Sequence, residues 1–155
     1  MHVADSKNSR GPGSDNHAFD SGCRARAGHA KKHFTRDGAD AQCESMGFKV
    51  SVTVADRAGL PIVMLRGDGA GLHTPEGAER KACTARTFSQ PSADFVKRLT
   101  ERLGSRQYTR VLALAGGLPI KAGSEVVGAV GVSGSPGKDD VGSQAGIDKV
   151  ADQLK

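Results

Sequence analysis

The pattern of hydrophobic and polar positions changes near residue 50. Valine stands at positions 50, 52 and 54 and alternates with Ser, Thr and Ala, which predicts a half-buried strand. Residues 60–66 predict a second strand. The turn between the two strands contains Asp56, a capping residue, and Gly59, which can adopt a positive φ. The two strands therefore predict a β-hairpin.

Two helical patterns follow the hairpin. Thr74 and Pro75 suit the start of a helix, as N-cap and first-turn residues. The helix predicted over 75–88 buries a face of small residues and one aromatic: Ala78, Ala82, Ala85 and Phe88. A second helix is predicted over 92–104, and its apolar stripe consists of Phe95, Val96, Leu99 and Leu103.

The C-terminal part predicts three short strands and a last helix. Residues 111–115, 118–121 and 125–134 are apolar runs separated by glycine turns. The third run is apolar on both faces, so both faces are expected to be covered, and its glycines mark close approach of another element. The last predicted helix begins at Asp139, and four of its residues are predicted to face the core: Val141, Ala145, Val150 and Leu154. The order β-β-α-α-β-β-β-α predicts an α+β domain with a five-stranded antiparallel sheet.

The first third of the chain has a different composition. Residues 1–49 hold only 4 Val, Ile, Leu or Phe residues, against 26 in the remaining 106, and they include no Leu or Ile. We therefore divide the chain into an atypical polar segment, 1–46, that is poorly ordered or replaces a helix, and a globular domain, 47–155. His29 and His33 would share one face of a helix. No third ligand is fixed nearby, which favours a solvated tail over a metal site.

Charge and composition exclude several classes of protein. The formal net charge is +5, but the excess is spread over both parts of the chain, and there is one Tyr and no Trp. Stacking surfaces for a nucleic acid are therefore nearly missing, and no nucleic-acid partner is expected. No aliphatic run could span a membrane and no apolar stretch follows Met1, so the chain as written is expected in the cytoplasm. The three cysteines have neither disulfide-framework nor zinc-motif spacing.

Candidate chemistry lies around the first predicted helix. The sequence GDGAG, residues 67–71, precedes that helix. It could bind an anion together with Arg66 and Lys81, or it could be a flexible connection, and both interpretations stay open. Asp56 and Asp68 could act as paired acids, although a turn-capping role is favoured for Asp56.

Two further residues carry reactive groups. Cys83 lies among alanines, a pattern more typical of a small buried residue than of a nucleophile. His73 is the only histidine of the globular domain and could be a ligand or an acid/base, with a solvated loop histidine favoured. There is no Ser-His-Asp set and no CxxC motif, so no catalytic residue is assigned and enzymatic activity stays an open question.

Three sequence strings taken together are diagnostic of a known family: LRGDGAG…AERKACTARTF (65–88), AGGLPIK (115–121) and VVGAVGVSGSPGKDD…AGI (126–147). With them the chain resembles the GlcG-like family of extracellular haem-binding proteins, which includes DhaG-type proteins and the C-terminal domain of PduO-type enzymes. The match covers about residues 47–153.

The resemblance implies a profilin-like three-layer α/β/α sandwich that assembles into homo-oligomers, often octamers. It implies haem as the cofactor, with haem breakdown in some members, and some relatives are secreted. It links Thr84 to the haem iron. Lys81 and Arg66 suit the haem propionates by charge, and His73 and Asp68 complete the predicted cofactor-binding set.

The chain departs from the family pattern before its first strand. Family members carry an Ala/Leu-rich amphipathic helix there, whereas this chain has FTRDGADAQCESMGF, residues 34–48. A frameshifted or artificial N-terminus would explain the difference, and a missing helix would leave one sheet face without a cover. The first functional hypothesis is an oligomeric haem-binding protein, with haem degradation or iron sensing as its activity. The alternative is an accessory module for another small ligand, such as a corrinoid or an organic acid of glycolate or diol metabolism.

Overall fold

The computed structural model describes residues 35–101 and 108–154. A helix over residues 35–45 comes first. The elements that follow it are β1 (Ser51–Ala55), β2 (Pro61–Arg66), α2 (Thr74–Phe88), α3 (Phe95–Glu101), β3 (Gly117–Ala122), β4 (Glu125–Ser133), α4 (Asp139–Asp148) and a short 3-10 helix, η2 (Ala151–Gln153). The predicted pair His29 and His33 lies outside the described residues. Within them, no helix combines the length and apolar character needed to cross a membrane.

The four strands form one antiparallel sheet in the order β2-β1-β4-β3. The predicted hairpin of β1 and β2 is confirmed, and so is the pairing of β3 with β4. Asp56 caps the first turn, because its Oδ1 accepts hydrogen bonds from the backbone amides of Ala58 (2.8 Å) and Leu60 (3.0 Å). Gly59 has a φ of 75°, as predicted.

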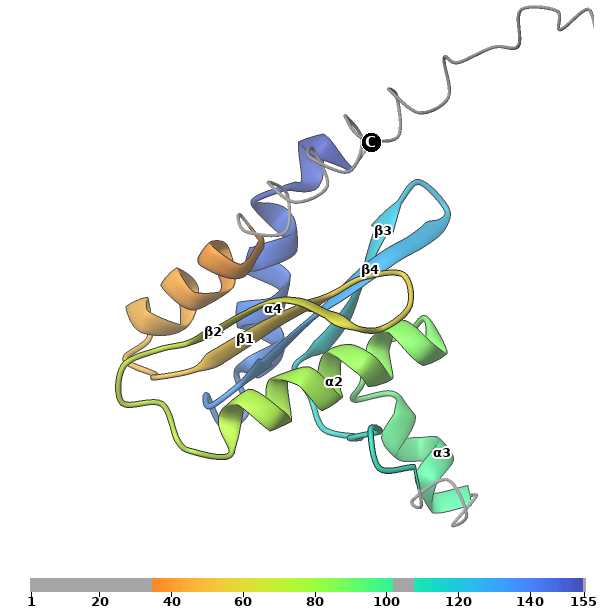
Figure 1. The fold of residues 1–155 in the computed structure, drawn as a ribbon, viewed down its shortest axis with the longest axis horizontal. Helices are drawn as coiled ribbons and strands as arrows, with labels where there is room; N and C mark the ends of the chain where they lie inside the picture. The colour runs from red at the N-terminus through yellow and green to blue at the C-terminus, as the bar shows by residue number, and fades with distance from the viewer. Residues whose placement is uncertain (1–34, 102–107, 155) are drawn as a thin grey trace, which may run out of the picture.

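Helices cover both faces of the sheet (Figure 1). α2 lies along one face, and α4 together with the helix over residues 35–45 lies on the other. The chain is therefore an α+β domain with a sheet between two helical layers. The profilin-like description stays a prediction.

The two faces of the sheet carry side chains of different size. Toward α4 and the first helix, β1 and β4 present valines, which form the main core: Val52, Val54, Val130 and Val132. Toward α2 they present small side chains: Ser51, Thr53, Ala55, Ala129 and Ser133, with Gly131 between them. The predicted close approach at the glycines of β4 is confirmed, because a Cβ built on Gly131 would lie 2.7 Å from the backbone nitrogen of Ala82. All five residues of β1 are buried, so the prediction of a half-buried strand is wrong: the side chains alternate in size and not in polarity.

The helix over residues 35–45 packs on the sheet with very small side chains. Ala39 and Cys43 are fully buried in the main core. Across from them, α4 presents Gly142 and Gly146, where an added Cβ would collide with the Cys43 sulfur and the Thr35 carbonyl. Small residues on both helices allow this close packing. This sheet face is thus covered although the segment has no Leu or Ile.

The fifth predicted strand, over 111–115, is not formed, so this part of the prediction is wrong. These residues are irregular, and among the described residues the sheet has four strands. Side chains of α2 form hydrogen bonds with backbone groups that a strand would use to pair with its neighbour. The Arg80 guanidinium donates to the Val111 carbonyl (3.0 Å), and the Leu112 amide donates to the Thr84 hydroxyl (2.8 Å). Backbone groups satisfied by neighbouring side chains do not need a sheet ladder.

Three smaller expectations about the helices are also wrong. Thr74 is not the N-cap of α2, because His73 holds that position and Thr74 is buried within the first turn. Its hydroxyl donates to the Gly71 carbonyl (2.7 Å). Val96 and Val141, predicted to face inward, are each 43% exposed. The buried side of α4 consists instead of its smallest residues and the first aspartate: Asp139, Gly142, Ser143 and Gly146.

Candidate ligand-binding site

Lys81, predicted to contact a haem propionate, lies in the interior between α2, β4 and α4. Only 3% of the residue is exposed. Its Nζ donates to Asp139 Oδ2 (2.6 Å) and to the Val132 carbonyl (3.0 Å). Asp139 Oδ1 in turn accepts from the amide and the hydroxyl of Ser135 (2.8 and 2.7 Å). The charge of Lys81 is thus engaged within a buried ion pair whose members are all hydrogen-bonded.

Thr84, predicted to contact the haem iron, is fully buried on the next turn of α2. Its hydroxyl donates to the Arg80 carbonyl (2.8 Å), four residues earlier, and accepts from the Leu112 amide (2.8 Å). Through this pair of bonds Thr84 connects α2 to the irregular segment that follows residue 107. That role was not visible in the sequence, because Leu112 lies 28 residues away.

The other three predicted residues lie in or beside the loop before α2, and all three are exposed. The Arg66 guanidinium donates to the Ala70 carbonyl (2.9 Å) and closes the GDGAG loop on itself. Asp68 lies at the tip of that loop, and His73 precedes the first residue of α2. The five predicted residues therefore do not lie together. Three are in or beside the loop before α2, Lys81 is buried beside Asp139, and Thr84 is hydrogen-bonded to Leu112.

A cavity of about 490 Å³ lies between the C-terminal half of α2 and residues 108–111, and we call it the α2 cavity. It is lined by Cys83, Thr87, Phe88, Tyr108, Thr109, Arg110 and Val111. Its volume is in the usual range of small-ligand sites. None of the five predicted residues lines it, although Thr84 follows Cys83 directly and binds the residue after Val111.

The chemistry of the α2 cavity was missed by sequence reasoning. Phe88 and Val111 supply apolar walls, and Phe88 stacks on Phe95 with 4.0 Å between ring centroids. Arg110 supplies a guanidinium that donates to Glu79 (3.2 Å) in a partly exposed pair. Cys83 and Tyr108 add a thiol and a phenol. The one sequence signal was the single tyrosine of the chain, beside Thr109 and Arg110 and outside any predicted element.

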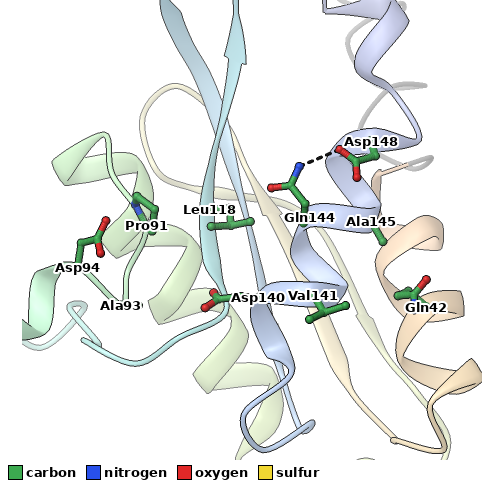
Figure 2. Close-up of a pocket in the computed structure, with 10 residues that line it drawn as sticks. All are labelled: Gln42, Pro91, Ala93, Asp94, Leu118, Asp140, Val141, Gln144, Ala145 and Asp148. Carbon is green, nitrogen blue, oxygen red and sulfur yellow. Dashed lines mark hydrogen bonds between the residues drawn. The ribbon is translucent and has the colours of Figure 1, made fainter.

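A second cavity, of about 640 Å³, lies on the opposite side of the sheet, between α4 and the segment before α3 (Figure 2). Its polar lining is acidic, with Asp94, Asp140 and Asp148 spread along it and Leu118 and Val141 between them. Gln144 donates to Asp148 (2.8 Å) at one end. Three carboxylates repel an anionic ligand. This cavity therefore suits a carboxylate-bearing cofactor less well than the α2 cavity does.

Two described residues have perturbed ionisation. Burial raises the pKa of Asp40, and the neighbouring Glu44 raises it further. Burial also raises the pKa of the Cys43 thiol, opposed by its hydrogen bond with Ser135. Cys43 lies in the core and lines neither cavity. Within residues 35–101 and 108–154 no group of three His, Cys, Asp or Glu residues could hold a metal ion.

Replacing Thr84 by valine is expected to lower the free energy of unfolding by about 1–3 kcal/mol, because the Leu112 amide loses its acceptor. Thr84→Ser keeps the hydroxyl and should stay close to the parent protein. Urea denaturation of both variants measures the difference. Equal midpoints for the valine and serine variants would contradict the role assigned to this hydroxyl.

The fold defines a three-layer α+β domain with a cavity along α2. Comparison with family models gives the particular family: residues 36–147 match the model described as haem degrading protein HbpS-like. The chain therefore belongs to the HbpS-like family, and the family resemblance drawn from its sequence is confirmed. A search of curated protein sequences gives no match.

Solved structures agree with this assignment. The chain is similar to HbpS, with 37% identity, a TM-score of 0.74, and coverage of 77% of this chain and 86% of that one. It is also similar to a double mutant of HbpS from Streptomyces reticuli, with 31% identity, a TM-score of 0.73, and coverage of 95% and 97%. A PduOC–haem complex shares the fold, with 23% identity, a TM-score of 0.72, and coverage of 77% and 91%.

Proposed function

We propose that this protein binds haem through α2 and the segment that packs on its C-terminal half. The observation that carries the proposal is the α2 cavity, which combines apolar walls with a guanidinium and two potential anionic donors. Membership of a family described as haem-degrading supports it. A protein of the same fold that was crystallised with haem supports it further.

The lining of the α2 cavity fits the chemistry of the cofactor. Haem presents a flat apolar ring, two carboxylates and an iron that takes an anionic or imidazole ligand. Phe88 and Val111 offer apolar contact, and Arg110 can pair with a carboxylate. Bound haem would supply a redox-active iron. The protein's own part is to hold the ring, neutralise a propionate and exclude water from one side.

The residues assigned from the family resemblance belong to this proposal with different roles. Thr84, which the family resemblance links to the iron, is fully buried outside the lining of the α2 cavity and holds the wall of that cavity by accepting a hydrogen bond from the Leu112 amide. Arg66, Asp68 and His73 are exposed in or beside the loop at the N-terminal end of α2 and do not line the α2 cavity, so they stay candidates from the family resemblance for a cofactor contact outside that cavity. Lys81 contributes by joining α2 to α4 through its ion pair with Asp139 and to β4 through its hydrogen bond to the Val132 carbonyl. Oligomeric assembly, octameric by family resemblance, and breakdown of the bound haem belong to the same proposal.

Titration with hemin tests the proposal. The expected result is a Soret band that saturates at micromolar hemin, with weaker binding after Thr84→Ala, which loosens the wall of the α2 cavity. Weaker binding after His73→Ala would instead favour a haem bound at the loop before α2. Size-exclusion chromatography of the loaded protein reports its assembly state. A spectrum that stays equal to that of free hemin would refute haem binding, and a thermal-shift screen with corrinoids and small organic acids would then test the alternative ligand classes.

A further inference from the structure

We infer that the sulfur of Cys83 is the iron ligand of haem bound in the α2 cavity, and that Arg110 pairs with a propionate. The inference rests on the proposed function that this protein binds haem. It differs from the family-based assignment of the iron to Thr84. Four observations support it.

The first observation is the donor set of the lining. Of the seven lining residues, only Cys83 and Tyr108 can become anionic donors of the kind that haem iron uses. The hydroxyls of Thr87 and Thr109 are neutral and weak ligands. Arg110 has no lone pair to offer while it is charged. The lining therefore restricts the iron ligand to a thiolate or a phenolate.

The second observation distinguishes these two donors. Cys83 is 9% exposed, whereas Tyr108 is 62% exposed. Cys83 stands between Ala82 and Thr84, which are both fully buried, and its sulfur lies 4.0 Å from the Thr87 hydroxyl, at the outer limit for a hydrogen bond to sulfur. Cys83 thus lies in the buried part of the cavity lining, and its sulfur makes only a weak contact with the Thr87 hydroxyl. Tyr108 lies on the solvent-exposed side of the cavity, which favours Cys83 as the ligand.

The third observation concerns the charge balance. Arg110 donates to Glu79 at 3.2 Å and weakly to the Gly59 carbonyl at 3.4 Å. The side chains of Arg110 and Glu79 are 49% and 35% exposed, so their ion pair contributes little to stability. Arg110 can therefore exchange this partner for a propionate at small cost.

The fourth observation is how the opposite wall is held. The Thr84 hydroxyl accepts from the Leu112 amide, and the Arg80 guanidinium donates to the Val111 carbonyl (3.0 Å). Both bonds anchor the segment that faces Cys83 across the cavity. Thr84 and Arg80 are thus positioning residues, and substituting them should weaken binding without changing the nature of the iron ligand.

The coordination step is balanced without any further reactant. The S–H bond of Cys83 breaks, the proton leaves to solvent, and an Fe–S bond to ferric haem forms. Neither the sulfur nor the iron changes oxidation state. Haem is the only added component.

Optical spectra of the hemin complex, and of its reduced carbon monoxide adduct, test the ligand directly. A thiolate ligand gives the adduct a strongly red-shifted Soret band. We expect that band for the parent protein and for Cys43→Ser, the matched control in the core. We expect Cys83→Ser to lose it and to bind hemin at least tenfold more weakly. Thr84→Ala and Tyr108→Phe should keep it.

The outcomes separate this inference from the proposed function. If the parent protein shows no Soret change with hemin, both fail. If the parent and Cys83→Ser bind hemin with the same affinity and the same adduct band, haem binding stands and the inference is overturned. Loss of the band in Thr84→Ala or Tyr108→Phe, with the band kept in Cys83→Ser, also overturns it.

Alkylation of the parent protein gives an independent readout if Cys83→Ser fails to fold. Iodoacetamide is applied with and without hemin, and labelled peptides are quantified by mass spectrometry. We expect hemin to protect Cys83 at least fivefold, while labelling of the core residue Cys43 stays unchanged. Equal labelling of Cys83 with and without hemin would overturn the inference.

Discussion

Replacing Lys81 by methionine is expected to lower the free energy of unfolding by about 3–5 kcal/mol, the cost of breaking a buried ion pair from one side. Lys81 Nζ lies 2.6 Å from Asp139 Oδ2, and both residues are buried. The methionine has a similar volume, so it leaves a buried carboxylate without its cation rather than a cavity. Urea denaturation at one fixed protomer concentration measures the loss, because assembly would otherwise shift the midpoint.

A double-mutant cycle provides the control. Asp139→Asn alone leaves the Lys81 ammonium unpaired, whereas Lys81→Met with Asp139→Asn removes both charges. We expect the double variant to be more stable than the sum of the single losses predicts, with a coupling of about 1–3 kcal/mol. Additive losses would show that the two charges do not interact. That result would remove the structural role proposed for Lys81 and return it to the candidates for propionate binding.

Much of the fold could be predicted because it depends on local pattern. Three features depend only on residues close together in the sequence: the alternation along β1, the capped turn at Asp56 and the alanine face of α2. The glycines of β4 predicted a close approach, and Gly131 meets the backbone of α2. Each of these features follows from periods of two or of three to four residues.

The errors arise where distant side chains satisfy the backbone. The apolar run 111–115 has the composition of a strand, but side chains of α2 bind its backbone: Arg80 donates to the Val111 carbonyl and Thr84 accepts from the Leu112 amide. Ser92 also donates to the Leu114 carbonyl. These contacts join residues 22 to 31 positions apart, and no local period encodes them. The strand prediction therefore failed at the place where the α2 cavity forms.

Contacts between residues far apart in the sequence also explain which part of the candidate site could be predicted. The motif around Lys81 and Thr84 identified the correct helix, because the family resemblance depends on local strings. It did not show that Lys81 is paired with Asp139, 58 residues later. The motif also could not show that Arg110 and Tyr108 lie beside Cys83, because their position depends on the path that the chain takes after α3.

Replacing Gly131 by alanine is expected to destabilise the fold by about 3 kcal/mol or more, at the upper end of overpacking costs. A Cβ at this position would lie 2.7 Å from the Ala82 backbone nitrogen and closer still to the Ala78 carbonyl oxygen. Both atoms belong to the backbone of α2, so no side chain can turn aside. The whole helix would have to lift from β4.

A lifted α2 should also weaken ligand binding, because the helix carries Cys83 into the α2 cavity. Gly137→Ala is the matched control, since a Cβ there meets nothing within 4 Å and only the φ of 72° opposes it. That strain costs about 1–2 kcal/mol. Thermal unfolding and hemin titration of both variants measure the two effects. A Gly131→Ala protein as stable as Gly137→Ala would show that α2 does not pack on β4 as closely as the structure has it.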